Sequence, residues 1–183
     1  MTVQIALLRA VNVAGSSMLS MARLKAMIEE LGFEAQTLLQ SGNVVLSGKD
    51  LSREALEKLL EAETEKRLAL KTDFFVRSAT EWDALVKANP YAREAKDDPG
   101  HLVVVALKSE PKAADVKALR AAIKGRESVI AKGRQLYAVY PDGIGRSKLT
   151  IGVIEKTLGT RGTGRNWNTV LKLAARAAEF ASR

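Results

Sequence analysis

The apolar run His101-Leu102-Val103-Val104-Val105-Ala106-Leu107 lies in the second half of the 183-residue sequence and is typical of a buried strand. A similar aliphatic run, Val3 to Leu8, opens the chain. Each run is followed by apolar residues at helical spacing and then by two strand-like segments joined by a glycine turn. Because the order strand, helix, hairpin occurs twice, we predict an internal structural duplication with little identity between its halves.

The first half continues beyond its hairpin into a second helix and a fourth strand. Ser20 and Ser52 are suited to cap its two helices, and Gly32 should end the first of them. The hairpin is predicted around Ser41-Gly42, as a two-residue connection between residues 34–40 and 43–47. A last strand over residues 73–77 gives the order β-α-β-β-α-β, which is the ferredoxin-like unit with both helices on one face of an antiparallel sheet.

A connector should separate the two halves. Ser78 and Glu81 form a capping box for a helix that ends at Asn89-Pro90. The polar segment from Tyr91 to Gly100 is predicted to be a linker or a functional loop.

The second half repeats strand, helix and hairpin, with the hairpin turn at Gly133-Arg134. After that hairpin the pattern departs from the first half, and we predict two basic turn-helix units instead. The predicted fold class is therefore α+β, with β-α-β-β-α-β followed by a β-α-β-β repeat and two extra C-terminal helices. The expected domains are residues 1–78 (ferredoxin-like half), 79–100 (connector helix and loop) and 101–183 (second half with basic helices).

Charge is concentrated near the C-terminus. The formal net charge is +8, and residues 144–183 contain eight lysines and arginines against two glutamates. This asymmetry favours an anionic partner, although a solvated basic surface that aids solubility is the simpler interpretation of charge alone. The sequence has no cysteine, which excludes disulfides and thiolate chemistry, so we expect a cytoplasmic protein. The apolar N-terminal run is too short to cross a bilayer, and no membrane association is expected.

The two basic turns are the main candidate site. Gly143 to Lys148 and Gly162 to Asn168 each place glycines and cations before a predicted helix start, where unpaired amides attract anions. We predict that Arg146, Lys148, Arg161 and Arg165 converge on one surface, and that replacing Arg165 by alanine would leave the fold nearly unchanged. The predicted ligand-binding residues are Arg146, Ser147, Lys148, Arg161, Gly164, Arg165, Asn166 and Asn168. Asn166 and Trp167 have equally plausible structural roles, as an N-cap and a packing anchor.

Other polar residues are weaker candidates. Arg9 and Asn12 follow the first strand, and Gln40 and Asn43 flank the first hairpin turn; turn chemistry alone also explains the hairpin residues. The single histidine, His101, has neither a cysteine nor a second histidine to join it in a catalytic or zinc site. We expect no metal and no cofactor, and the sequence leaves open whether the protein is an enzyme.

Several segments together resemble the bacterial DUF1697 family, whose members have no characterised function. The two most specific segments are Tyr140-Pro141-Asp142-Gly143-Ile144-Gly145-Arg146-Ser147-Lys148-Leu149 and Arg165-Asn166-Trp167-Asn168-Thr169-Val170. Shorter matching segments are residues 7–13, 21–24, 31–33, 40–45 and 89–90. The resemblance implies an α+β arrangement of ferredoxin-like halves and carries no activity or catalytic residue. The first loop departs from the family pattern, because Ala10 and Ala14 replace glycines and Ser16-Ser17-Met18 replaces cations.

The function that we predict from the sequence is binding of a phosphate-bearing or other anionic small ligand at the basic C-terminal turns. The alternative is a non-enzymatic module that binds nucleic acid or a protein partner through the same basic surface. RNA-binding ferredoxin-like sheets stack bases on exposed aromatic residues, and here the second half offers only Tyr137 and Tyr140. Nucleic-acid binding would then be weak and salt-sensitive. The oligomeric state is left open.

Overall fold

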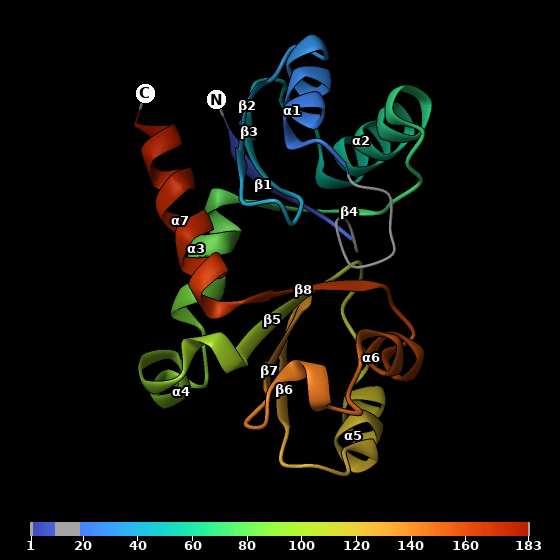
Figure 1. Cartoon of the computed structure of the whole chain (residues 1–183), viewed down its shortest axis with the longest axis vertical. Helices are drawn as coiled ribbons and strands as arrows, with labels where there is room; N and C mark the ends of the chain where they lie inside the picture. Colours follow the sequence, from blue (N-terminus) through green and yellow to red (C-terminus); the bar gives the residue numbers. More distant parts are fainter. Residues whose placement is uncertain (1, 10–18, 183) are drawn as a thin grey trace. The chain divides into compact units, whose positions relative to one another are not determined.

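The computed structural model describes residues 2–9 and 19–182 (Figure 1). Within these residues the strands form two four-stranded antiparallel sheets, and the chain divides into two compact units. The first unit contains Met1–Ala84 and Lys172–Arg183, and the second contains Leu85–Leu171. In order, the elements are β1 (Val3–Leu8), α1 (Met21–Glu30), β2 (Glu34–Leu38), β3 (Asn43–Ser47), α2 (Arg53–Leu68), β4 (Phe74–Ser78), α3 (Ala79–Lys87), α4 (Ala92–Asp97), β5 (Leu102–Leu107), α5 (Ala113–Ala122), β6 (Ser128–Lys132), β7 (Gln135–Val139), α6 (Ile151–Leu158), β8 (Gly162–Asn166) and α7 (Trp167–Ala181).

The first sheet has the strand order β2-β3-β1-β4. Helices α1 and α2 bury their apolar sides against it, in a core that includes Leu24, Ile28, Leu56 and Leu60. The predicted caps are confirmed, since Ser20 accepts a hydrogen bond from the amide of Arg23 and Ser52 accepts one from Ala55. This unit is the predicted β-α-β-β-α-β arrangement.

The first hairpin turn is longer than predicted. Leu38 pairs with Asn43, so the connection has the four residues 39–42 instead of two. Leu39 and Gly42 both adopt positive φ values, of 61° and 73°. The Asn43 side chain donates to the Leu38 carbonyl at 2.9 Å, and this bond favours the wider turn.

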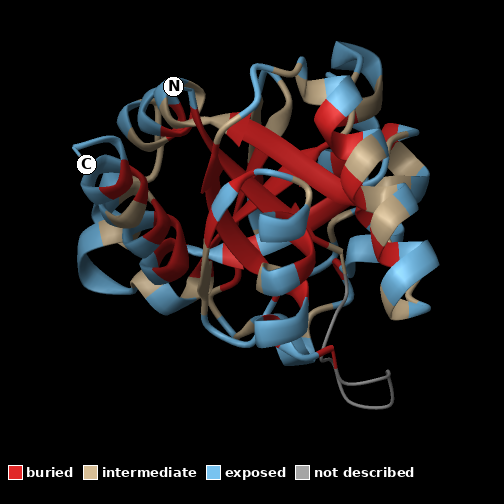
Figure 2. Cartoon of the chain, turned by 90° about the horizontal axis from the view of Figure 1, so that it is seen from above, coloured by how far each residue is buried: buried red, intermediate tan, exposed pale blue. Residues whose placement is uncertain are grey.

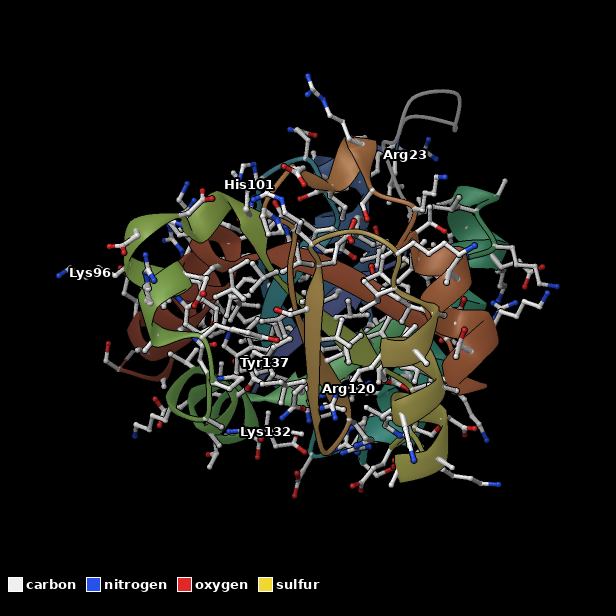
Figure 3. The ribbon with its side chains drawn as sticks, turned by 90° about the horizontal axis from the view of Figure 1, so that it is seen from below. Arg23, Lys96, His101, Arg120, Lys132 and Tyr137 are labelled. Atoms are coloured by element: carbon white, nitrogen blue, oxygen red, sulfur yellow. The ribbon has the colours of Figure 1, made fainter. Side chains whose placement is uncertain are left out.

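The second sheet repeats the first, with the order β6-β7-β5-β8. Helices α5 and α6 pack against one face of it, in a core that includes Val105, Leu119, Leu136 and Ile154. Arg120 ties α5 to β6, because its Nε donates to the Val129 carbonyl at 3.1 Å (labelled in Figure 3). The strands β1, β3, β4, β5 and β7 are buried almost throughout, while the helices keep exposed outer faces (Figure 2). The α+β class and the two ferredoxin-like halves are therefore confirmed.

Two C-terminal segments differ from the prediction. Gly162–Asn166, expected to be a turn, is the strand β8, which pairs with β5 and completes a full β-α-β-β-α-β half. The helix expected after the first basic turn begins only at Ile151. Thr150 is its N-cap, because its side chain accepts a hydrogen bond from the amide of Val153. Residues 144–146 form a separate 3₁₀ turn.

The segment from Tyr91 to Gly100 is not an irregular linker. Residues Ala92–Asp97 form the short helix α4, and a 3₁₀ turn over Pro99–His101 leads directly into β5. The His101 ring is hydrogen-bonded through Nδ1 to Asp98 Oδ2 at 2.7 Å, which closes this turn. No helix of the described residues is long and apolar enough to cross a membrane.

Candidate functional site

A cavity of about 460 Å³ lies in the second unit, beside the end of α5 and the start of α6. The ferredoxin-like order explains its place, because α5 and α6 run in opposite directions over the sheet and bring these two ends together. The segment that joins β7 to α6 supplies much of the wall. The lining residues are Ala122, Ile123, Lys124, Gly125, Glu127, Asp142, Arg146, Ser147, Lys148, Leu149 and Val153.

Tyr140 holds this joining segment at both ends. Its carbonyl accepts the amide of Gly143 at 2.9 Å, and its hydroxyl donates to the carbonyl of Leu149 at 3.0 Å. Gly143 has a φ of 84°, a conformation that glycine adopts without strain and that lets the chain turn after Asp142. The segment that carries Arg146, Ser147 and Lys148 is thus anchored to Tyr140 at two points, one on its backbone and one on its buried side chain.

Three cations line the cavity: Lys124, Arg146 and Lys148. All three are exposed. Across the part of the chain that the structure describes, their side chains form no hydrogen bond and no ion pair. Their charge is therefore open to a ligand, apart from the attraction between Arg146 and the nearby Asp142 carboxylate.

The two carboxylates of the wall are already engaged. Asp142 accepts hydrogen bonds from Nε and Nη2 of Arg126, and this pair, helped by the charges of Arg146 and His101, lowers the pKa of Asp142. Glu127 accepts a hydrogen bond from the Ser147 hydroxyl, whose oxygen in turn accepts the amide of Leu149 at 2.9 Å. Neither carboxylate forms an ion pair with Lys124, Arg146 or Lys148 within the described residues.

Such an arrangement suits an anion with an apolar portion. Cations in a concavity with low-dielectric walls attract anions more strongly than the same cations on a flat surface. Ile123, Leu149 and Val153 supply the apolar part of the wall, and Val153 is itself 37% exposed. A volume of about 460 Å³ falls in the usual range for small-molecule pockets, roughly 300 to 1,000 Å³.

The structure brings together one part of the predicted site. Arg146, Ser147 and Lys148, all from the first basic turn, line the same cavity. The convergence predicted for all four cations is wrong, because the second basic turn is a strand. Asn166 and Asn168 are exposed, and Asn166 is the N-cap of α7, accepting the amide of Thr169 at 3.0 Å.

Arg165 lies on the other side of the sheet from the cavity. Side chains alternate along β8, and Arg165 is paired with Val104, whereas Gly162 and Gly164 are paired with the core residues Leu107 and Val105. Arg165 is only 8% exposed, and its Nη1 donates to Thr163 Oγ1 and to the Gly164 carbonyl. It packs within the fold and does not line the cavity.

Arg161 lies at the other end of β8 from Asn166. Its carbonyl accepts the amide of Lys108, just beyond the end of β5, whereas Asn166 pairs with Val103 near the start of β5. Arg161 therefore lies away from Arg146 and Lys148 because the length of the strand separates them. Gly164 is the partner of Val105, and its amide belongs to the sheet.

The secondary candidates belong to the first unit. Asn43 is fully buried and donates to the Leu38 carbonyl and to Ser41 Oγ, so it stabilises the hairpin turn. Gln40 is exposed in that turn. Arg9 holds the end of β1 through its backbone, donating to the Asp73 carbonyl and accepting from the Thr72 hydroxyl. Asn12 lies outside the described residues.

Sequence reasoning missed Lys124, Glu127 and Asp142 as members of one site. Lys124 and Glu127 come from the link between α5 and β6, and the signal that could have found them is the repeat itself. A complete second ferredoxin-like half would have predicted that the end of its first helix meets the start of its second.

Tyr137 (labelled in Figure 3) and Tyr140 are buried, and the Tyr137 hydroxyl donates to the Leu85 carbonyl at 2.6 Å, so neither ring offers a stacking surface for bases. Among residues 2–9 and 19–182, no group of three or more histidine, aspartate and glutamate side chains is placed to hold a metal ion.

Fold and cavity together define an α+β protein of two ferredoxin-like halves with a basic cavity in the second. The family model described as "Protein of unknown function (DUF1697)" matches residues 1–137, and the chain belongs to this family. The matched range includes Lys124 and Glu127 and ends before Arg146.

Among solved structures, the chain is similar to the conserved bacterial protein SP0830 from Streptococcus pneumoniae. The TM-score is 0.74 and the sequence identity 19%, over 96% of this chain and 98% of that chain. At this identity the similarity shows the shared fold alone. No curated protein matches the sequence.

Proposed function

We propose that the protein binds a phosphate-bearing or other anionic small ligand in the cavity of its second unit. The observation that carries the proposal is the presence of Lys124, Arg146 and Lys148 on one concave wall without ion-pair partners among the described residues. Holding three like charges together costs repulsion, which a bound anion offsets. Arg146 can bind a phosphate through two parallel N–H groups, and the lysines add point charges.

The engaged carboxylates support this proposal. Asp142 forms an ion pair with Arg126, and Glu127 accepts a hydrogen bond from the Ser147 hydroxyl. Among the described residues, neither carboxylate forms an ion pair with the three cations, so their positive charge is not neutralised in this way. The apolar residues of the wall favour an organic anion over a bare ion, because they gain from covering an apolar portion of the ligand.

Thermal unfolding tests the proposal. The full chain is heated with inorganic phosphate, pyrophosphate, and a panel of sugar phosphates and nucleotides, each at the ionic strength of a matched potassium chloride control. A ligand at 100 times its dissociation constant stabilises by about 2.7 kcal/mol, which raises the melting temperature by roughly 5 to 10 °C for a chain of this length.

The variant Arg146→Ala/Lys148→Ala should abolish this stabilisation. Lys117→Ala is the matched control, because Lys117 is an exposed cation of α5, in the same unit, that does not line the cavity. Equal stabilisation of the double variant and the wild type would contradict the proposal. Tight binding of duplex DNA of any sequence, with a log-log salt slope near 0.9 per neutralised phosphate, would support the nucleic-acid alternative instead.

A further inference from the structure

We infer that the ligand of this cavity is a phosphate ester that carries hydroxyl groups, and that Glu127 accepts hydrogen bonds from those hydroxyls. The inference rests on the proposed function and adds the residue that recognises the part of the ligand beyond its anionic group. Lys124, Arg146 and Lys148 account for the anionic group, whereas a carboxylate in the same wall needs a donor.

A hydrogen bond from Ser147 holds the Glu127 carboxylate in place. The Ser147 hydroxyl donates to Oε1, and because its oxygen also accepts the amide of Leu149, its orientation is fixed. The carboxylate also lies close to the backbone of Gly125, near the position that an added Cβ would occupy.

Glu127 keeps an unused acceptor. Oε2 accepts no hydrogen bond within the described residues, although a carboxylate offers about four acceptor positions. The residue is partly buried in a cavity wall, so water that leaves when a ligand enters must be replaced by another donor. A ligand with hydroxyl groups meets this need, and a simple anion leaves the carboxylate desolvated and unpaired.

The neighbouring charges favour a neutral donor over an ammonium group. A ligand ammonium placed at Glu127 would share the cavity with Lys124, Arg146 and Lys148 and would be repelled by all three. A hydroxyl satisfies the same acceptor without that repulsion. The chemical class that fits is thus a phosphorylated polyol or sugar.

Calorimetric titration of the full chain with methyl phosphate and ribose 5-phosphate tests the inference, since both are phosphate monoesters and they differ in hydroxyl groups. The wild type should bind ribose 5-phosphate about 10-fold or more tightly than methyl phosphate, as expected for hydrogen bonds to a charged acceptor. Glu127→Ala should abolish this preference and should bind methyl phosphate more tightly than the wild type, because a negative charge is removed from the anion site.

Two further variants separate positioning from folding. Glu127→Gln keeps an acceptor and a partner for Ser147, so it should retain part of the preference even if Glu127→Ala proves unstable. Ser147→Ala should reduce the preference for ribose 5-phosphate, because the Ser147 hydroxyl positions the Glu127 carboxylate. Unchanged far-ultraviolet circular dichroism checks the fold of each variant.

The outcomes distinguish this inference from the proposed function. Equal affinity for the two esters in the wild type, or a preference that persists in Glu127→Ala, would overturn the inference; the proposed function would stand if binding still required Arg146. Tighter binding of phosphoethanolamine than of ribose 5-phosphate would overturn the choice of a neutral donor. Failure of every phosphate ester and of inorganic phosphate to bind would overturn both.

Discussion

Arg165 is the residue at which sequence and structure diverge most. Its position among glycines and other cations predicted an exposed ligand for an anion, but strand alternation turns it to the face opposite Gly164. Burial disfavours its charged form and lowers its pKa to about 10. The guanidinium instead donates to Thr163 Oγ1 and to the Gly164 carbonyl, so Arg165 stabilises the end of β8.

Replacing Arg165 by alanine should therefore destabilise the protein by about 2 to 4 kcal/mol, because packing and buried hydrogen bonds are both lost. This expectation replaces the small effect predicted from sequence. Arg161→Ala, at an exposed position just before β8, should cost less than about 1 kcal/mol. Urea unfolding measures both, and equal small effects would show that Arg165 is not held inside the fold.

Two buried tyrosines make stability sensitive to alkaline pH. Burial raises the pKa of Tyr137 and of Tyr140 to about 12, from an ordinary value of 10. Between these values the unfolded chain has released protons that the folded chain still holds, so the free energy of unfolding falls as pH rises from about 10 to 12. Arg165 acts in the opposite direction, since its lowered pKa makes the folded chain release its proton first.

The double variant Tyr137→Phe/Tyr140→Phe should show a shallower loss of stability over this range. It is less stable at neutral pH, because each hydroxyl donates to a backbone carbonyl. The comparison is therefore between slopes, from urea unfolding at pH 9.5 and pH 11.5. The same slope in wild type and variant would show that Tyr137 and Tyr140 do not cause this pH dependence.

Among the helices and strands, β8 is the element that the sequence did not predict. Gly162-Thr163-Gly164-Arg165-Asn166 has two glycines and lacks the β-branched and aromatic density of β5 or β7, so local propensity favours a turn. The segment becomes a strand because β5 offers an unpaired edge and the glycines allow close approach. By contrast, the capping box at Ser78 and Glu81 was predictable, since both of its hydrogen bonds are local.

The close approach at Gly162 gives a direct test of β8. A Cβ there would lie 2.8 Å from Val105 Cγ1 and 3.0 Å from Leu107 Cδ2, so Gly162→Ala should destabilise by about 1 to 3 kcal/mol through overpacking. Gly100→Ala is the matched control, because an added Cβ there meets nothing within 4 Å and should change stability by less than about 0.5 kcal/mol. Thermal or urea unfolding of the two variants side by side decides the matter.

The whole chain is a more complete duplication than its sequence suggested. Both sheets have the same strand order, and β4 and β8 are each followed at once by a helix, α3 and α7. Arg77 and Arg165 occupy equivalent places: each is the fourth residue of its strand, is buried, and donates to the preceding carbonyl at 2.8 Å. Strand order, helices and caps were therefore accessible from the sequence, because they follow from periodicity and local hydrogen bonds.

The candidate site was accessible only in part. Arg146, Ser147 and Lys148 were found because glycines and cations mark a turn that approaches ligands, and the structure places them on one cavity. To predict Lys124 and Glu127 as members of the site, one must know which helix ends meet. To exclude Arg165 from the site, one must know the register of β8. Both depend on contacts between residues far apart in the sequence, which local patterns do not contain.

A titration of the ¹⁵N-labelled full chain with inorganic phosphate, followed by amide chemical shifts, shows whether the cavity of the second unit binds an anion. We expect saturable shifts concentrated in residues 122–127 and 142–149, which vanish in Arg146→Ala/Lys148→Ala and persist in Lys117→Ala. Shifts centred on Arg161 and the start of β8, or the same shifts in the double variant as in the wild type, would contradict it.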